Sequence, residues 1–351
     1  MNSMKTFTEG FIERQPVTQG LIKTIRLIGE YKGKQDLFKE QAPQILETLR
    51  KTAIIQSTES SNRIEGITAP LERIKEIVAD KTTPRNRSEQ EIAGYRDVLN
   101  TIHNNHQNIP FTIGMVLQLH RDLYQFVTGE GGAWKLVDNE ITETHPDGTK
   151  IVRFRPVPAY ATPDAMRDLH DRFNTLWDSG NVELLFLIPS YVLDFLCIHP
   201  FRDGNGRMAR LLTLLLLYRA GYEVGCFISL EQIIERTKES YYDTLYQSSQ
   251  GWHEGQHSLI PWWEYFLGVM LLSAYKEFEQ RVGLVSTAKG AKTATVLDAI
   301  RGMKSEFSVK DLQERCPAVG IDLIRRILRQ EREADRLECL GRGPDARWKN
   351  K

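Results

Sequence analysis

The sequence has few cysteines and no apolar stretch of membrane-spanning length. Its four cysteines among 351 residues are scattered and form no CxxC pair, which fits a reducing compartment better than a disulfide scaffold. The leucine-rich run Leu211–Leu217 is far too short to cross a bilayer. The first fifteen residues lack the apolar core of a signal peptide. We therefore expect a cytoplasmic protein.

Neither sign of charge is in excess. Lysine and arginine together number 46, as do aspartate and glutamate, so the overall charge does not point to nucleic acid or a membrane surface. A hydrophobic content of 41% and a charged content of 26% are typical of a soluble globular protein. The length allows two or three domains with an ample core.

Chemically useful residues are concentrated in residues 199–210, HPFRDGNGRMAR. A glycine-rich backbone that opens a helix can bind phosphate, because its free N–H groups and the helix dipole point outward. His199 can act as a base near neutral pH, and Asp203 is placed to hold Mg²⁺ on phosphate oxygens. Arg207 and Arg210 share one face of the first turn. This combination predicts chemistry on a nucleotide, although a simple glycine turn between two helices with solvated arginines is the alternative.

The same segment resembles the signature of the Fic family, H-x-F-x-[D/E]-G-N-G-R-x-x-R, at every defined position. The resemblance implies an all-helical core over about residues 110–275 and transfer of AMP from ATP to a protein hydroxyl. It makes His199 the base, Asp203 the Mg²⁺ ligand and Phe201 the anchor of the loop in the core. The positions that it assigns to the nucleotide phosphates are Gly204, Asn205, Gly206, Arg207 and Arg210. Transfer of phosphocholine or another nucleotide remains an alternative.

An inhibitory element is predicted upstream. The segment Ser61–Gly66, SNRIEG, is similar to the Fic inhibitory motif [S/T]-x-x-x-E-[G/N], which implies an inhibitory helix at about residues 48–66. Glu65 would pair with Arg210 and repel the γ-phosphate by roughly 4 kcal/mol at 4 Å and an effective dielectric of about 20. One alternative is a helix that ends at a C-cap glycine, Gly66, with Glu65 solvated. Another is that Glu65 orients water for removal of AMP.

A β-hairpin is predicted between Gly129 and Pro158, with a turn at residues 146–148 between runs rich in Ile, Val and Thr. It could be an ordinary surface hairpin. The Fic resemblance implies a flap that aligns the target chain by main-chain pairing, with Ile151–Phe154 nearest the nucleotide. In the later helical segment, the resemblance places Tyr241 or Tyr242 beside adenine, and core aromatics are the alternative.

The segment His253–His257, HEGQH, formally matches the zinc motif H-E-x-x-H. That motif requires both imidazoles on one face of a helix. Gly251 and Gly255 interrupt the helical pattern, and no third ligand is evident. We therefore expect a loop and no zinc.

The C-terminal residues 293–351 resemble a winged helix, with three helices followed by a hairpin. Residues 291–351 contain 14 Lys/Arg and 10 Asp/Glu, a net charge of +4 (14 − 10). Arginines line the third helix, where a recognition helix would meet phosphates, but acidic residues alternate with them, which is typical of a solvated face. This pattern slightly favours protein recognition or a homodimer contact over DNA. The basic positions are Arg325, Arg326, Arg329 and Arg332.

The expected protein is mainly α-helical, with a hairpin flap and a small winged-helix unit. The expected parts are an N-terminal helical region (1–109), a Fic core (110–275), a linker (276–292) and the winged-helix-like unit (293–351). The expected activity is ATP- and Mg²⁺-dependent adenylyl transfer to a Ser, Thr or Tyr hydroxyl of a protein, including itself, restrained by Glu65. The alternatives are a DNA-binding regulator whose Fic core senses nucleotide, and an enzyme that removes AMP.

Overall fold

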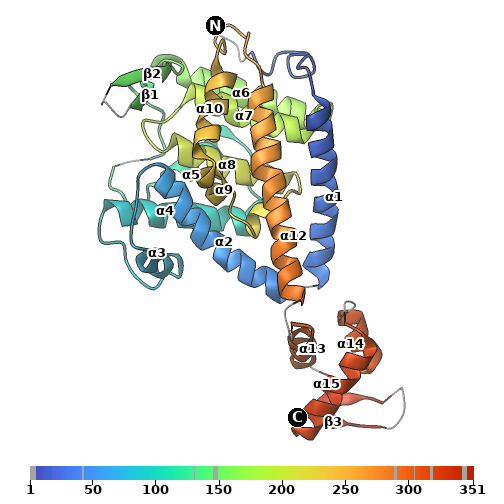
Figure 1. Cartoon of the computed structure of the whole chain (residues 1–351). Helices are drawn as coiled ribbons and strands as arrows, with labels where there is room; N and C mark the ends of the chain where they lie inside the picture. Colours follow the sequence, from blue (N-terminus) through green and yellow to red (C-terminus); the bar gives the residue numbers. More distant parts are fainter. Residues whose placement is uncertain are drawn as a thin grey trace. The chain divides into compact units, whose positions relative to one another are not determined.

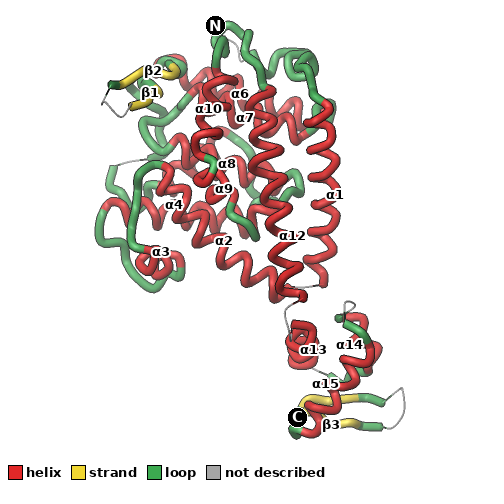
Figure 2. The backbone as a smooth tube through the Cα atoms, viewed as in Figure 1, coloured by secondary structure: helices red, strands yellow, loops and turns green. Residues whose placement is uncertain are grey.

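The computed structural model describes residues 5–41, 43–129, 131–144, 149–287, 291–303, 305–316, 319–341 and 346–351. The described chain is mainly α-helical, as predicted, and its strands form two separate two-stranded antiparallel sheets (Figure 2). It divides into two compact units. The first contains Met1–Glu30 and Arg50–Tyr275, and the second contains Tyr31–Leu49 and Lys276–Lys351. No described helix combines the length and the apolarity needed to cross a membrane.

The elements up to the catalytic motif follow the predicted helical pattern closely (Figure 1). In chain order they are α1 (Gln19–Gln41), α2 (Pro43–Ile64), α3 (Leu71–Val78), α4 (Arg87–Asn105), α5 (Ile113–Leu123), β1 (Ile141–Thr144), β2 (Lys150–Phe154), η1 (Ala159–Ala161), α6 (Thr162–Ser179) and α7 (Leu184–Ile198). Helix α1 runs through Gly33, since one helical glycine costs only about 1 kcal/mol. The new helix begins at Pro43, a residue suited to the first helical position.

The remaining elements are α8 (Asn205–Arg219), η2 (Val224–Cys226), α9 (Leu230–Arg236), α10 (Lys238–Ser249), α11 (Ile260–Trp263), the π-helical η3 (Glu264–Leu271), α12 (Leu272–Thr287), α13 (Ala291–Arg301), α14 (Val309–Arg315), α15 (Ile321–Glu333), β3 (Leu337–Cys339) and β4 (Trp348–Asn350). Because α12 continues to Thr287, most of the segment predicted as a linker is helical. The predicted hairpin turn at residues 146–148 lies outside the described residues.

Helix α8 is the centre of the first unit. Every residue from Leu211 to Leu217 is buried, as expected of a helix that is apolar on all sides. Helices α4 and α7 pack directly against it. Complete burial of one leucine side chain stabilises the fold by about 1.5–3 kcal/mol. The leucine-rich helix is therefore firmly packed, and it fixes the position of the glycine loop at its N-terminus.

The second unit contains packed helices and a small core. Within it α1 and α12 lie side by side, where the rings of Phe38 and Phe278 meet edge to face at 6.0 Å and Lys34 pairs with Glu279 at 2.6 Å (Figure 1). Ser308 caps α14 in a reciprocal capping box with Asp311. The last three helices and the β3–β4 hairpin enclose their own apolar cluster, which includes Val296, Phe307, Leu312, Ile324, Leu328 and Trp348. This order of elements is the one expected for a winged helix.

An N-terminal segment covers the outer end of α7. The buried Asp194 on α7 accepts hydrogen bonds at 2.6 Å from the Thr6 hydroxyl and from the Trp252 indole N–H, while its Oδ2 has no partner. Thr6 also contacts His257 Nε2 at 3.0 Å. The HEGQH segment is a loop in which His253 and His257 bind different partners. No group of three potential metal ligands occurs among the described residues.

We expect Asp194→Asn to stabilise the protein at alkaline pH. Burial raises the pKa of Asp194 from its ordinary 3.8 to about 7, against the effect of the Thr6 and Trp252 hydrogen bonds. The unfolded state loses this proton at lower pH, so the carboxyl's contribution to stability falls as pH rises through 7. Asparagine stays neutral and keeps one acceptor, so Tm should rise by about 2–4 °C at pH ~8.

Thermal unfolding of the parent and the variant at pH ~6 and ~8 measures this effect. The difference in Tm between the two proteins should be larger at the higher pH. A variant that is less stable by the same amount at both values would contradict the assignment.

Candidate active site

The loop between α7 and α8 has a fixed and unusual backbone. His199 follows α7 directly and adopts a left-handed conformation with φ of +51°, which is uncommon for a residue with a side chain. Gly204 has φ of +80°, and a Cβ there would lie only 3.0 Å from the Tyr124 hydroxyl, so both conformation and space require glycine. The loop therefore turns sharply twice within six residues.

Two buried side chains close this loop. The Asn205 amide oxygen accepts a hydrogen bond from Phe201 N at 2.9 Å, and its Nδ2 donates to Phe201 O at 2.8 Å. The fully buried Phe201 ring stacks on His120 at 3.6 Å. Asn205 was predicted among the phosphate contacts, and Phe201 was predicted as the anchor of the loop in the core. In the structure their side chains hold the loop together, which leaves the Asn205 main chain to face a ligand.

His199 is held as a neutral imidazole. Its Nδ1 lies 3.3 Å from Leu196 O, and since a carbonyl can only accept, Nδ1 carries the proton and Nε2 is free to accept one. Burial lowers the pKa of His199 to about 4, with a further lowering by the positive charge of Lys135. Opposing effects come from the Leu196 hydrogen bond and from Glu65 and Asp203. The arrangement suits a general base at neutral pH.

Glu65 occupies the N-terminal end of α8. It follows the last residue of α2, and its carboxylate lies so close to Gly206 that a Cβ there would be 2.2 Å from Oε1. No side chain caps α8, whose N-cap is Gly204. The first N–H groups of a helix and its dipole attract an anion. The carboxylate therefore occupies the position that the sequence analysis assigned to phosphate oxygens.

The same carboxylate contacts Arg210. The Arg210 guanidinium is buried and donates from Nη2 to Glu65 Oε1 at 2.7 Å, which is the predicted ion pair. Its Nε donates to Ser61 Oγ at 2.8 Å, and Nη2 also donates to Ser61 O at 2.9 Å. Burial works against this charge, but the Glu65 carboxylate raises the pKa of Arg210 above its ordinary value. Ser61 and Glu65, both predicted as inhibitory residues, therefore hold one cation of the site.

A buried polar cluster holds α2 against the first unit. Ser57 of α2 donates to Glu231 Oε2 at 2.7 Å, and the Tyr95 hydroxyl donates to Glu231 Oε1 at 2.9 Å. All three residues are buried. Because an unpaired buried carboxylate is costly, this cluster favours one position of α2.

The Arg207 guanidinium contacts Glu91 and Tyr124, while its predicted contact with phosphate stays a prediction. Its guanidinium is 1% exposed and pairs with Glu91 of α4 at 2.7 Å. It also donates to the Tyr124 hydroxyl at 2.7 Å. Removing either partner of a buried ion pair costs about 3–5 kcal/mol. The Arg207 side chain therefore joins α8 to α4 and to the end of α5.

Asp203 is exposed beside this N-terminus. Its Oδ1 accepts a hydrogen bond from Gly204 N at 2.6 Å, which fixes the carboxylate against the loop. Mg²⁺ in nucleotide sites is often bound by one or two carboxylates, substrate phosphates and water. A single exposed carboxylate fits that mode, whereas a metal site made of protein ligands alone is not present among the described residues.

The two tyrosines proposed for adenine differ in exposure. Tyr241 is buried and packs edge to face on Trp262 and Tyr265. Tyr242 is 44% exposed, and both Glu65 and Arg210 influence its pKa, which burial raises. Only the Tyr242 ring is accessible to a stacked base in this structure.

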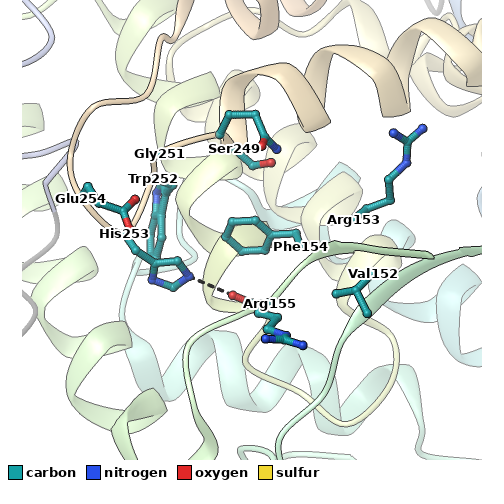
Figure 3. Close-up of a pocket in the computed structure, with 10 residues that line it drawn as sticks. Val152, Arg153, Phe154, Arg155, Ser249, Gly251, Trp252, His253 and Glu254 are labelled. Atoms are coloured by element: carbon teal, nitrogen blue, oxygen red, sulfur yellow. Dashed lines mark hydrogen bonds between the residues drawn. The ribbon is translucent and has the colours of Figure 1, made fainter.

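The predicted hairpin is formed by β1 and β2, paired antiparallel with an irregularity between Ile141 and Thr142. A cavity of about 360 Å³ lies between β2 and the loop that follows α10 (Figure 3). In it the Phe154 ring stacks on His253, and His253 Nε2 donates to Arg155 O at 2.8 Å. The Arg153 guanidinium lies 4.4 Å from the centre of the Tyr246 ring. Strand β2 therefore packs against α10.

Sequence reasoning did not find several residues that support the loop. Lys135 and Asn139, which precede β1, bind main-chain carbonyls of residues 198–201. His120 bridges Asp203 O and Gly132 N. No local motif marks these side chains, because their partners lie about 60 or more residues away, with Gly132 the exception.

Comparison with known proteins agrees with this geometry. The model of the Fic/DOC family matches residues 110–217, which include the whole loop. The chain contains a Fic domain. The family match ends at Leu217, so the extension of the domain to residue 275 remains a prediction.

Relatives with a Fic domain cover different shares of the chain. The curated protein "Protein adenylyltransferase Fic" of Nematostella vectensis is 28% identical over 215 residues, which are 57% of this chain and 44% of that protein. The chain thus spans less than half of that relative. A Fic family protein from Desulfovibrio desulfuricans G20 has a TM-score of 0.63 at 23% identity and covers 95% of this chain and 97% of its own. A Fic domain containing signalling protein from Bacteroides thetaiotaomicron VPI-5482 has a TM-score of 0.61 at 22% identity, over 73% and 98%.

We expect His199 of the Fic domain to remain neutral where an ordinary histidine titrates. Because its pKa is near 4 and not 6.5, the ring carbon resonances of His199 should not shift between pH ~8 and ~5.5. A carbon–proton NMR titration, with His199→Ala used to assign the signal, measures this directly. A midpoint near 6.5 would show that the imidazole is solvated and would contradict the assignment.

Proposed function

We propose that the protein is an adenylyltransferase that moves AMP from ATP to a hydroxyl group of a protein. The observation that carries the proposal is the contact of one carboxylate, Glu65, with both Arg210 and the N-terminal turn of α8. A guanidinium and a helix N-terminus are two groups that bind phosphates. The name of the Nematostella vectensis relative, a protein adenylyltransferase, agrees with this chemistry.

In the proposed reaction the target hydroxyl oxygen attacks the α-phosphorus of ATP. His199 Nε2 accepts the hydroxyl proton, a new oxygen–phosphorus bond forms, and the bond to the β-phosphate oxygen breaks as diphosphate leaves. The neutral tautomer of His199 supports the role of base. The main-chain N–H groups of Gly206 and Arg207 are suited to stabilise the charge that develops on the phosphates.

Asp203 would hold Mg²⁺ in the loaded site, where the ion would neutralise phosphate charge as diphosphate departs. The exposed carboxylate and its hydrogen bond to Gly204 N support this role. The γ-phosphate would take the position on Arg210 that Glu65 occupies. The exposed Tyr242 ring is the better placed of the two tyrosines for the adenine base.

Glu65 would inhibit the reaction by competing for Arg210. ATP can reach the guanidinium only after the 2.7 Å pair with Glu65 opens. Phosphate and carboxylate are both negatively charged. Two like unit charges about 4 Å apart repel each other by roughly 4 kcal/mol at an effective dielectric of about 20. Glu65 is the more exposed partner, with 32% of its side chain accessible, so it can move aside while Arg210 stays.

We expect Glu65→Gly to increase self-modification by about tenfold or more, because it frees Arg210 without touching the base. The measurement is incubation of the full-length parent, Glu65→Gly and Glu65→Gly/His199→Ala proteins with α-labelled ATP and Mg²⁺. Label should appear on the single variant and not on the double variant.

Equal labelling of the parent and Glu65→Gly would contradict the inhibitory role. Labelling that survives loss of His199 would contradict the role of base. If the parent instead releases AMP from a labelled protein and Glu65→Gly does not, the removal reaction is favoured, with Glu65 orienting water.

We propose DNA binding by residues 293–351 as a second function, on a specific observation. Two of the acidic residues near the arginines of α15 are paired elsewhere, Glu331 with Arg336 at 2.7 Å and Asp335 with Lys351, whereas the exposed Asp322 and Glu333 form no ion pair with a described residue. Arg325, Arg329 and Arg332, one face of α15, are exposed and form no ion pair with any described residue. Exposed unpaired arginines on one helix face suit phosphate contacts.

We expect the full chain to bind a labelled DNA duplex at low salt, with affinity that falls as salt rises. Arg325→Ala/Arg329→Ala should weaken binding about tenfold and reduce the salt slope, whereas Arg336→Ala, which removes an arginine already paired, should change it little. Fluorescence anisotropy at several salt concentrations measures both. Binding that is absent at low salt would rule out this function.

A further inference from the structure

Two residues upstream of the hairpin bind four consecutive carbonyl groups around His199. Lys135 Nζ donates to Ile198 O at 3.0 Å, and Lys135 N donates to Pro200 O at 2.8 Å. Asn139 Nδ2 lies 3.5 Å from His199 O and 3.3 Å from Phe201 O. The carbonyls of residues 198–201 therefore all point toward the same short segment, residues 135–139.

The segment is also fixed within itself and to the hairpin. Lys135 Nζ donates to Asn139 Oδ1 at 2.8 Å, which orients the Asn139 amide so that its Nδ2 faces the loop. Asp138 accepts a hydrogen bond from Ala159 N at 2.7 Å, which ties the segment to the chain beyond β2. Strand β1 begins at Ile141, two residues after Asn139. The base of the hairpin and the loop that carries His199 are thus both fixed to residues 135–139.

Burial of the Lys135 ammonium group costs free energy, and no ion pair with a described residue offsets this cost. The Lys135 side chain is buried, and among the described residues its ammonium group has only neutral oxygen acceptors within hydrogen-bond distance. Burial lowers the pKa of Lys135 to about 8, with Asp138 acting in the opposite direction. Buried lysines are rare unless paired. A buried ammonium at the main chain of a catalytic loop points to a function.

The left-handed backbone conformation of His199 indicates what the buried Lys135 does. A non-glycine residue in this conformation costs about 1–3 kcal/mol and persists only where its surroundings enforce it. The carbonyls on either side of His199 are the groups that Lys135 binds. The positive charge of Lys135 also disfavours protonation of the His199 imidazole. Leu136 and Val137, which follow Lys135 in the chain, are exposed. Packing of these two apolar side chains therefore does not hold residues 135–139 in place.

We propose that Lys135, assisted by Asn139, is a positioning residue that holds His199 and the base of the β1–β2 hairpin in register. The proposal rests on the adenylyl transfer proposed above, in which the base and the target chain must meet within hydrogen-bond reach. Lys135 touches neither ATP nor the target. It acts through the carbonyls of Ile198 and Pro200.

The test uses full-length protein with Glu65→Gly as the parent, so that inhibition does not mask the rate. Lys135→Met removes the donor and the charge, Lys135→Gln keeps a donor, and Lys150→Met is the matched control at an exposed lysine of the same hairpin. Lys135→Met should lower the AMP transfer rate at saturating ATP by about tenfold or more, with the dissociation constant for ATP changed less than twofold. Lys135→Gln should recover part of the rate, and Lys150→Met should keep it.

Hydrogen–deuterium exchange on the same proteins supplies a readout that does not depend on activity. Uptake in residues 196–206 should increase in Lys135→Met and stay unchanged in Lys150→Met. Unchanged uptake there, or a rate within twofold of the parent, overturns the proposal. So does a loss of ATP affinity equal to the loss of rate, since that reports general damage to the site. If Lys135→Met does not fold, Asn139→Ala, which removes the side-chain donor to His199 O and Phe201 O, decides by the same criteria.

If the Glu65→Gly parent transfers no AMP, the proposed function fails by itself. The exchange measurement still decides whether Lys135 holds the loop. Failure of the two proposals is therefore distinguishable.

Discussion

Burial of a guanidinium inside a protein is costly unless an anion pairs with it, and that constraint organises the site. Arg210 is 3% exposed and lies on the first turns of a leucine-rich helix that cannot move without disrupting the core. Its anionic partner in this structure is Glu65, from a helix more than a hundred residues earlier in the chain. A triphosphate is the other kind of anion that would satisfy it. Under the proposed function, inhibition and ATP binding would thus be two ways to meet one requirement.

The surrounding structure makes the two states exclusive. Ser61 binds Arg210 through both its hydroxyl and its carbonyl, so the cation stays in place whichever anion it holds. The Glu231 cluster holds the preceding part of α2 through Ser57. Glu65 lies just beyond the end of the helix, where a short turn can change without unfolding α2. Under the proposed function, relief of inhibition would require movement of one side chain and its turn, and not of a domain.

Much of this arrangement could be predicted from sequence because it is local. The order HPFRDGNGR fixes the left-handed turns, the helix start and the glycine that admits an anion, all within twelve residues. The Glu65–Arg210 pair was also predictable, but only through resemblance to a family. The mainly α-helical fold was predicted as well, whereas the continuation of α12 to Thr287, through most of the predicted linker, was not.

The contacts that sequence reasoning missed join residues far apart in the chain. The ion pair of Arg207 with Glu91, more than a hundred residues away, is one of them. Lys135 has no motif around it, because what it binds is main-chain carbonyl groups, which every residue carries. Net charge likewise could not show that Glu331 and Asp335 are paired away from the arginines of α15. Contacts that depend on tertiary packing have no local sequence signal.

The central claim is that Glu65 and ATP compete for Arg210, and ATP affinity tests it most directly. Isothermal titration with Mg²⁺ and ATP should be carried out on the parent, Glu65→Gln, Arg210→Ala and the double variant. Glu65→Gln should tighten binding by about tenfold or more when Arg210 is present, and by much less when it is absent, because the two residues are coupled. The same ATP affinity in the parent and Glu65→Gln, or the same gain in both backgrounds, would contradict the account.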